Sequence, residues 1–382
     1  MIGKFTDFYG FAPEAAAQAP GRLEVLGNHT DYSEGFVISC AVSQQITFAL
    51  KRCAGSVCKV VDFRTGEVME FDLAALDAPP PRSGAKYIIG MMNEMRKRSW
   101  QPVAFNGALE STVPLSAGMS SSAALEMSCG LALGKATGFE LEKPEWARTG
   151  QGVENNFLGL KTGLLDQFSS LYGQDNALIM SDFRTVEVTK TLPLPPGYVF
   201  VVVNSMKKHD LVDSDYNARR EDCESAAAKL AAAYKGVKTL RDVTSEMLAE
   251  SKNLLTLREF RRASHVVGEC ERVQQAAEAL AKSDIDAFGK LLFASHASSR
   301  ENFENSTPEL DCLVELAATL GSRGARLSGG GFGGITIHLV EEAAAELYAQ
   351  RIAVAYESRT GIVPETFICT PSAGAQVLNC AD

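Results

Sequence analysis

The stretch VPLSAGMSSSAALEM, residues 113–127, passes from an apolar run through small residues into good helix formers. We interpret it as a strand that ends at Pro114, a loop, and a helix that begins at the serines. Such a junction directs backbone N–H groups and the positive end of the helix dipole toward one place, which suits a polyphosphate. Serines that only cap the helix are the alternative. The candidate phosphate-binding residues are Gly118, Met119, Ser120, Ser121 and Ser122.

A second stretch rich in glycine, SGGGFGGITIHLV at residues 328–340, leads into a predicted strand. Glycine at such a place lets the backbone approach a ligand closely or adopt positive φ. Neither stretch has the spacing of a common nucleotide motif, because no Gly-Lys-Ser/Thr follows the serines and these glycines precede a strand instead of following one. A tight turn beside packed backbone is the alternative.

The rest of the chain mixes short β-rich runs with long helical patterns. Strands are predicted at residues 35–42, 46–52, 58–63, 107–114, 198–204 and 334–340. Helices are predicted at residues 123–138, 223–234, 258–282, 285–299 and 341–357. With 382 residues the chain is long for one core. We therefore expect an α/β (α+β) protein of two lobes with a cleft between them.

Composition excludes several classes of function. The net charge of −10 argues against non-specific binding to nucleic acid or to an anionic membrane surface. The first residues contain no apolar run long enough for a signal peptide, and no apolar run approaches a membrane span. Nine cysteines lack CxxC spacing, so they indicate neither a zinc site nor a disulfide framework. We expect a cytoplasmic protein.

Polar and charged residues gather at three further places. The stretch GRLEVLGNHTDYSEG, residues 21–35, is either a solvated turn or a set of groups that holds a small polar molecule. Asp166 lies in the otherwise apolar stretch TGLLDQFSSLYG, where an aspartate needs a partner or a task. Amides of a helix could supply that partner. Glu154, taken by itself, is more typical of a charge on the surface of a helix.

Taken together, these stretches resemble a known family. GRLEVLGNHTDYSEGFV resembles the galactokinase signature, and VPLSAGMSSSAALE and LSGGGFGG resemble the second and third motifs of the GHMP small-molecule kinases, in the same order. Further matches, such as SDYNARREDCE and PSAGAQVL, extend the resemblance over nearly the whole chain. The resemblance implies a two-lobed GHMP fold that binds ATP and a sugar between an N-terminal lobe, residues 1–178, and a C-terminal lobe, residues 179–382.

The resemblance also assigns roles to matching residues. Arg22 matches the arginine that faces the transferred phosphate, and Asp166 matches the catalytic aspartate beside the C1 hydroxyl of the sugar. Mg²⁺ would lie between Ser122 and Glu154. The residues that match sugar contacts are Asn28, His29, Asp31, Gly163 and Tyr216. Those that match ATP contacts are Gly118, Met119, Ser120, Ser121, Ser122 and Gly330. A monomer or weak homodimer is expected.

One departure keeps the substrate open. Galactokinases usually have a glutamate where this chain has Asn28, at a position that accepts a hydrogen bond from the C6 hydroxyl. Asparagine carries no charge that would repel a C6 carboxylate. Galactose is expected, with galacturonate or N-acetylgalactosamine as alternatives. A sugar-sensing regulator without activity is a second alternative, although Arg22, Asp166 and the serine run are all present. A GHMP kinase for mevalonate or homoserine is a third.

Overall fold

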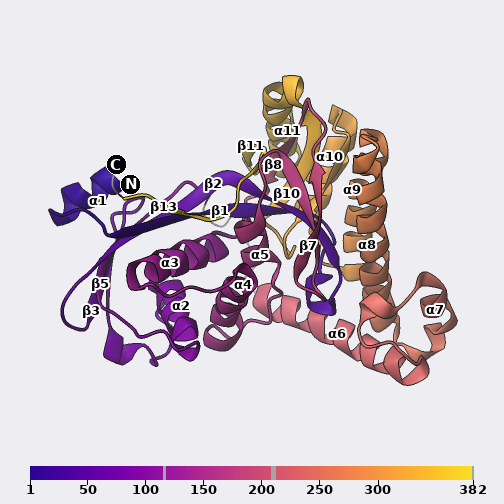
Figure 1. Ribbon diagram of the computed structural model, residues 1–382. Helices are drawn as coiled ribbons and strands as arrows, with labels where there is room; N and C mark the ends of the chain where they lie inside the picture. Colours follow the sequence, from indigo (N-terminus) through magenta and orange to yellow (C-terminus); the bar gives the residue numbers. More distant parts are fainter. Residues whose placement is uncertain (115–117, 208–211, 381–382) are drawn as a thin grey trace.

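The computed structural model describes residues 1–114, 118–207 and 212–380, and it contains a larger and a smaller sheet (Figure 1). Within these residues the larger sheet has the order β13-β1-β2-β5-β3-β4, β6 and β12 also pair with β2, and β7 pairs with β6. All pairs are antiparallel except β3 with β5. The strands are β1 (Ala15–Leu26), β2 (Phe36–Arg52), β3 (Val57–Asp62), β4 (Val68–Asp72), β5 (Phe105–Ser111), β6 (Ala177–Asp182), β7 (Glu187–Pro193), β12 (Pro371–Ser372) and β13 (Gln376–Leu378).

The smaller sheet has the order β11-β8-β10-β9 and is antiparallel throughout. Its strands are β8 (Tyr198–Asn204), β9 (Gly324–Ser328), β10 (Ile335–Glu341) and β11 (Glu365–Cys369). Strand β13 pairs with β1, so the last described strand returns to the N-terminal sheet, where Leu378 packs in one cluster with Phe5 of the N-terminal helix (Figure 1).

Helices cover both sheets. On the larger sheet α3 and α5 pack against β1 and β2, with α2 and α4 packed behind them (Figure 1). The smaller sheet is flanked by α9, α10 and α11, and α8 packs between α9 and α6. The helices are α1 (Ile2–Tyr9), α2 (Ala85–Lys97), α3 (Ser121–Thr137), α4 (Lys143–Gly152), α5 (Leu165–Tyr172), α6 (Val212–Ala233), α7 (Ser245–Glu250), α8 (Leu257–Ala281), α9 (Ile285–Ser298), α10 (Pro308–Leu320) and α11 (Ala345–Thr360). Among the described residues, no helix combines the length and apolar character that crossing a membrane requires.

The mixed α and β prediction is confirmed, with differences at element ends. The two strands predicted at residues 35–42 and 46–52 form the single strand β2, because β1 pairs with it on both sides of the polar residues between them. Strand β5 ends at Ser111, three residues before the predicted end at Pro114. The predicted lobe boundary at residue 178 falls inside β6, which pairs with β2 of the larger sheet. That sheet therefore extends beyond the boundary.

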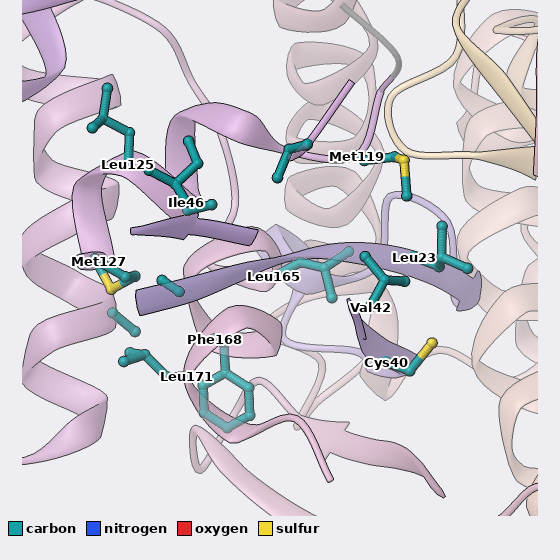
Figure 2. Close-up of a cluster of buried hydrophobic side chains, with 14 of the residues drawn as sticks. Leu23, Cys40, Val42, Ile46, Met119, Leu125, Met127, Leu165, Phe168 and Leu171 are labelled. Carbon is teal, nitrogen blue, oxygen red and sulfur yellow. The ribbon is translucent and has the colours of Figure 1, made fainter. Parts of the chain in front are cut away.

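A continuous apolar core supports the residues at the sheet junction. Leu23 of β1, Met119 before α3 and Leu165 of α5 are buried in the same cluster (Figure 2). The cluster also includes Ile335 of β10, so side chains of both sheets contribute to it. Each of the first three is the chain neighbour of a polar candidate residue, Arg22, Ser120 or Asp166. Burial of the apolar neighbour thus fixes where each polar side chain lies.

Candidate active site

Segments far apart in the sequence meet at one cavity. Its lining includes most of the residues that the sequence predicted for the sugar and the reaction, one that it predicted for ATP, Gly330, and four that it did not predict. The predicted ones are Arg22, His29, Asp31, Gly163, Asp166, Tyr216 and Gly330. The others are Glu24, Thr162, Leu165 and Gly329.

Arg22 and Asp166 form an ion pair at the edge of this cavity. The Arg22 Nε donates to Asp166 Oδ1 at 2.7 Å, and its Nη1 donates to the Gly118 carbonyl at 2.7 Å. The Arg22 side chain is 6% exposed, and that of Asp166 is 28% exposed. Burial disfavours the charged guanidinium, but the Asp166 and Glu24 carboxylates outweigh burial and raise the pKa of Arg22. A fixed cation therefore lies beside a carboxylate that remains accessible.

The serine loop lies against the same pair. The Ser120 hydroxyl donates to Asp166 Oδ2, and the Arg22 backbone N–H donates to the Met119 carbonyl at 3.0 Å. Ser120 precedes α3 with φ of 54°, and its side chain makes no capping hydrogen bond, so the alternative in which the serines only cap the helix does not describe Ser120. Met119 is 1% exposed, so its side chain belongs to the apolar core. Residues 115–117 of the predicted loop lie outside the described residues.

The helix that carries Asp166 is joined to the signature through Asp31. The Leu165 backbone N–H donates to Asp31 Oδ2 at 3.2 Å. A Cβ on Gly163 would lie 1.7 Å from that same oxygen, so the close approach requires glycine. Burial, together with the nearby Asp166 carboxylate, raises the pKa of Asp31.

His29 is a neutral imidazole held between two partners. Its Nε2 lies 3.0 Å from the Gly330 carbonyl, which can only accept, so Nε2 carries the proton and Nδ1 accepts from the Tyr32 hydroxyl at 3.0 Å. Burial lowers the pKa of His29 to about 3. The Tyr216 ring lies 4.9 Å from the imidazole, centroid to centroid, and a Cβ on Gly330 would lie 3.3 Å from the Tyr216 ring. The third motif therefore closes the cavity against the signature.

Asn28 does not line the cavity. It is 0% exposed, its Nδ2 donates to Glu24 Oε1 at 2.8 Å and to the Gly329 carbonyl at 2.9 Å, and its Oδ1 accepts from Asn305 Nδ2 at 3.0 Å. Its predicted direct contact with the sugar therefore has no geometric support. The carboxylate at this side of the cavity is that of Glu24, which the sequence analysis missed. The available signal was strand alternation, which places residues 22 and 24 on the same face of β1.

Glu269 of α8, also missed, fixes the turn beneath His29. Its Oε2 accepts the backbone N–H groups of Gly27 and Asn28, each at 2.9 Å, and Arg272 Nε donates to its Oε1 at 2.5 Å. Burial alone would raise the pKa of this carboxyl, but Arg272 and His265 outweigh burial and lower it to about 2. No local pattern in the sequence connects residue 269 to residue 27.

Glu154 is buried, not on a helix surface. Its side chain accepts from Ser122 Oγ at 3.3 Å and from Thr162 Oγ1 at 2.6 Å, and the residue is 6% exposed. Burial and the Asp166 carboxylate raise its pKa to about 7. A hydroxyl and a carboxylate are oxygen donors of the kind that Mg²⁺ takes when phosphates complete its shell. Across the described residues, no group of three or more His, Cys, Asp or Glu forms a metal cluster, so this pair would need further oxygens from a ligand.

Family models match three segments of the chain. The galactokinase galactose-binding signature matches residues 3–52, the N-terminal domain of GHMP kinases matches residues 86–174, and their C-terminal domain matches residues 276–356. A galactokinase of Actinobacillus pleuropneumoniae is 39% identical over 383 residues, which cover 98% of both chains. A galactokinase of Haemophilus influenzae is 38% identical over 373 residues, which cover 96% of this chain and 95% of that one.

Solved structures give the same assignment. The galactokinase of Lactococcus lactis, solved in complex with galactose, superposes with a TM-score of 0.93 at 27% identity over 98% of both chains. The mevalonate kinase of Methanococcus jannaschii, with a TM-score of 0.64 at 19% identity over 93% of this chain and 98% of that one, shares the fold. Galactokinase homology over nearly the full length, the GHMP domains and the geometry of the cavity agree, and this chain belongs to the galactokinase family of the GHMP kinases.

Proposed function

We propose that this protein transfers the terminal phosphoryl group of ATP to the C1 hydroxyl of galactose. The observation that carries the proposal is the meeting of Arg22, Asp166 and Ser120, because it joins the sugar signature, the serine loop and α5 at one cavity. Phosphoryl transfer needs in-line positioning and stabilisation of charge more than covalent chemistry by the protein. The paired cation and carboxylate supply both requirements.

Asp166 is proposed to accept the proton of the C1 hydroxyl or to orient that hydroxyl. The Arg22 guanidinium, held by Asp166 and the Gly118 carbonyl, would stabilise the charge that develops on the transferred phosphoryl group. His29, Asp31, Gly163 and Tyr216 would hold the sugar, since they line the cavity beside this pair. The N–H of the neutral His29 imidazole donates to the Gly330 carbonyl, and Nδ1 accepts from Tyr32, so the ring is fixed and would contact the sugar through its carbon atoms.

The nucleotide is proposed to bind at the N-terminus of α3. Gly118, Met119 and Ser120 precede that helix, Ser121 and Ser122 open it, and Gly330 lines the cavity. The N–H groups at a helix N-terminus are suited to phosphate oxygens. Ser122 and Glu154 would hold Mg²⁺, which when bound neutralises charge on the phosphates.

The remaining parts of the proposal concern the protein as a whole. We propose a cytoplasmic enzyme that is a monomer or weak homodimer and has no nucleic-acid or membrane partner. The negative net charge and the nine free cysteines support the location and the absence of such partners.

Substitution of Asp166 by asparagine tests the assignment. Asp166→Asn keeps the size of the side chain but removes the base, and loss of a positioned base reduces turnover by about 10²–10⁴-fold. ADP release in a coupled assay should fall by that factor, while galactose binding, measured by calorimetry, is retained. A variant with the turnover of the wild type would reject the role of Asp166. Absence of galactose-dependent ADP release in the wild type would reject the proposed function.

A further inference from the structure

We propose that Glu24 is the residue that recognises the C6 end of the sugar. Its carboxylate accepts a hydrogen bond from the C6 hydroxymethyl group of galactose and excludes sugars that carry a carboxylate at C6. The inference rests on the proposed function, because it concerns the same cavity and substrate. Glu24 thus takes the role that the sequence suggested for position 28, which is to accept a hydrogen bond from the C6 hydroxyl.

The position of Glu24 along β1 matches the length of a hexose. Arg22, Leu23 and Glu24 pair in regular register with Ala41, Cys40 and Ser39 of β2. The side chains of residues 22 and 24 therefore share one face of the strand, about 6.6 Å apart along it. A sugar with its C1 hydroxyl beside Asp166 and Arg22 extends along this face, and the hydroxymethyl group is the substituent that projects furthest from C1.

The carboxylate of Glu24 is oriented with one oxygen available. Its Oε1 accepts from Asn28 Nδ2 at 2.8 Å and from Arg326 Nη2 at 3.0 Å. Within the described part of the chain, both hydrogen bonds of this carboxylate go to Oε1. The side chain is 5% exposed, and that exposure is to the cavity that it lines. Oε2 is thus the atom left for a ligand hydroxyl.

Charge at the cavity wall explains why a carboxylate at C6 is excluded. Burial raises the pKa of Glu24, but the Arg326 and Arg22 guanidinium groups favour its ionised form. An ionised carboxylate only accepts hydrogen bonds, so it offers no proton to a second carboxylate. Asp31 and Asp166 line the same cavity and add negative charge, and the Arg22 cation that also lines it is already paired with Asp166. Arg326 is 0% exposed and absent from the lining, so it forms an ion pair with Glu24 and cannot contact a bound anion. Position 28 cannot take this role, because both ends of the Asn28 amide are already bonded within the protein.

Kinetics with three sugars test the inference. The values of kcat/KM for galactose, 6-deoxygalactose and galacturonate are measured for the wild type and for Glu24→Gln. The wild type should prefer galactose over both others. Because a hydrogen bond to a charged acceptor is stronger than one to a neutral acceptor, the preference over 6-deoxygalactose should fall about 10-fold in the variant, mainly through a higher KM for galactose. The preference over galacturonate should fall by at least about 10-fold as the charge is removed.

Two further variants serve as controls. Glu94→Gln changes a glutamate of α2 that is similarly buried and paired with an arginine, Arg98, but lies outside the cavity lining, so it should leave both sugar preferences within about twofold of the wild type. Glu24→Gln combined with Arg326→Met removes both charges and avoids an unpaired buried arginine, and it should show the same altered preferences if the single variant does not fold.

The outcomes separate the two proposals. If the wild type phosphorylates galactose but the Glu24 variants keep both preferences, Glu24 does not recognise C6 and only this inference is overturned. A wild type that phosphorylates galacturonate as efficiently as galactose would overturn it as well. If the wild type releases no ADP with galactose, the proposed function itself fails.

Discussion

The signature segment, residues 22–31, has two sides that differ in how completely their polar groups are bonded. On the cavity side, Asp166 beside Arg22 is 28% exposed, and Glu24 keeps one oxygen free of hydrogen bonds within the described residues. On the core side, Glu269 accepts two backbone N–H groups, a serine hydroxyl and an arginine.

This difference distinguishes polar groups that can bind a ligand from polar groups that stabilise the fold. A buried polar group without a partner is costly, so a fully bonded one such as Asn28 is best explained by its contribution to the fold. A group with remaining capacity at a cavity wall, such as Glu24, is suited to a ligand. Both residues belong to one short motif, and only the structure shows that Asn28 is fully bonded whereas Glu24 has an oxygen available at the cavity.

The largest expected effect on the core side is a loss of stability in Glu269→Gln. The pKa of Glu269 is lowered to about 2 in the folded protein, so its charge contributes stability that is fully present above pH 4.5 and is lost as pH falls toward 2. The shift corresponds to about 3 kcal/mol of unfolding free energy at pH 7. Chemical denaturation at pH 7 and at pH 4 should show a difference between wild type and variant that narrows at the lower pH.

Glu271→Gln is the matched control for this prediction. Glu271 lies on the same helix, two residues further, but is exposed, so its substitution should change the unfolding free energy by less than about 0.5 kcal/mol. A Glu269 variant as stable as this control would show that the core side does not hold the turn.

The sequence predicted what depends on local pattern and on family motifs. Strand β8 was predicted with its observed ends, and helix α9 with an end one residue too long, since apolar runs and helical spacing are local signals. The motifs also identified Arg22 and Asp166, which are 144 residues apart and in contact. Local signals of this kind do not depend on which elements pack together.

What the sequence could not show depends on packing between distant elements. The side of the signature that faces Glu269 is set by α8, more than two hundred residues away. Glu154 appeared to be a surface charge because the two residues that follow it are polar, whereas in the structure it is 6% exposed and accepts from Ser122 and Thr162. The position of Glu24 at the cavity was not predicted because strand alternation along β1 was not applied to it, and the complete burial of Asn28 depends on contacts with distant segments.

On the cavity side, Gly163→Ala should weaken sugar binding. The added Cβ would overlap Asp31 Oδ2, at 1.7 Å, and displace the carboxylate from its bond with the Leu165 N–H. A displacement of this size commonly costs about 10²-fold, which we expect as a higher KM for galactose. Gly84→Ala, where the nearest atom to a new Cβ is 3.7 Å away, should leave that KM within about twofold. An unchanged KM in Gly163→Ala would show that Asp31 does not hold the sugar.

The smallest expected effect is on the pH dependence of the Mg²⁺ requirement. It tests Glu154, which is buried like the groups of the core side but is proposed to bind a ligand like those of the cavity side. Its pKa of about 7 means that it is protonated below pH 7, and a protonated carboxyl does not bind Mg²⁺. The Mg²⁺ concentration for half-maximal rate should therefore rise by up to about tenfold per unit as pH falls below 7. Glu154→Gln removes this titration, so the variant should need more Mg²⁺ at pH 8. Below pH 7, the logarithm of its half-maximal Mg²⁺ concentration should change with pH less steeply than in the wild type, by a slope of about one. Because protonation of ATP affects both proteins equally, identical slopes in wild type and variant would remove Glu154 from the metal site and leave it a purely structural carboxyl.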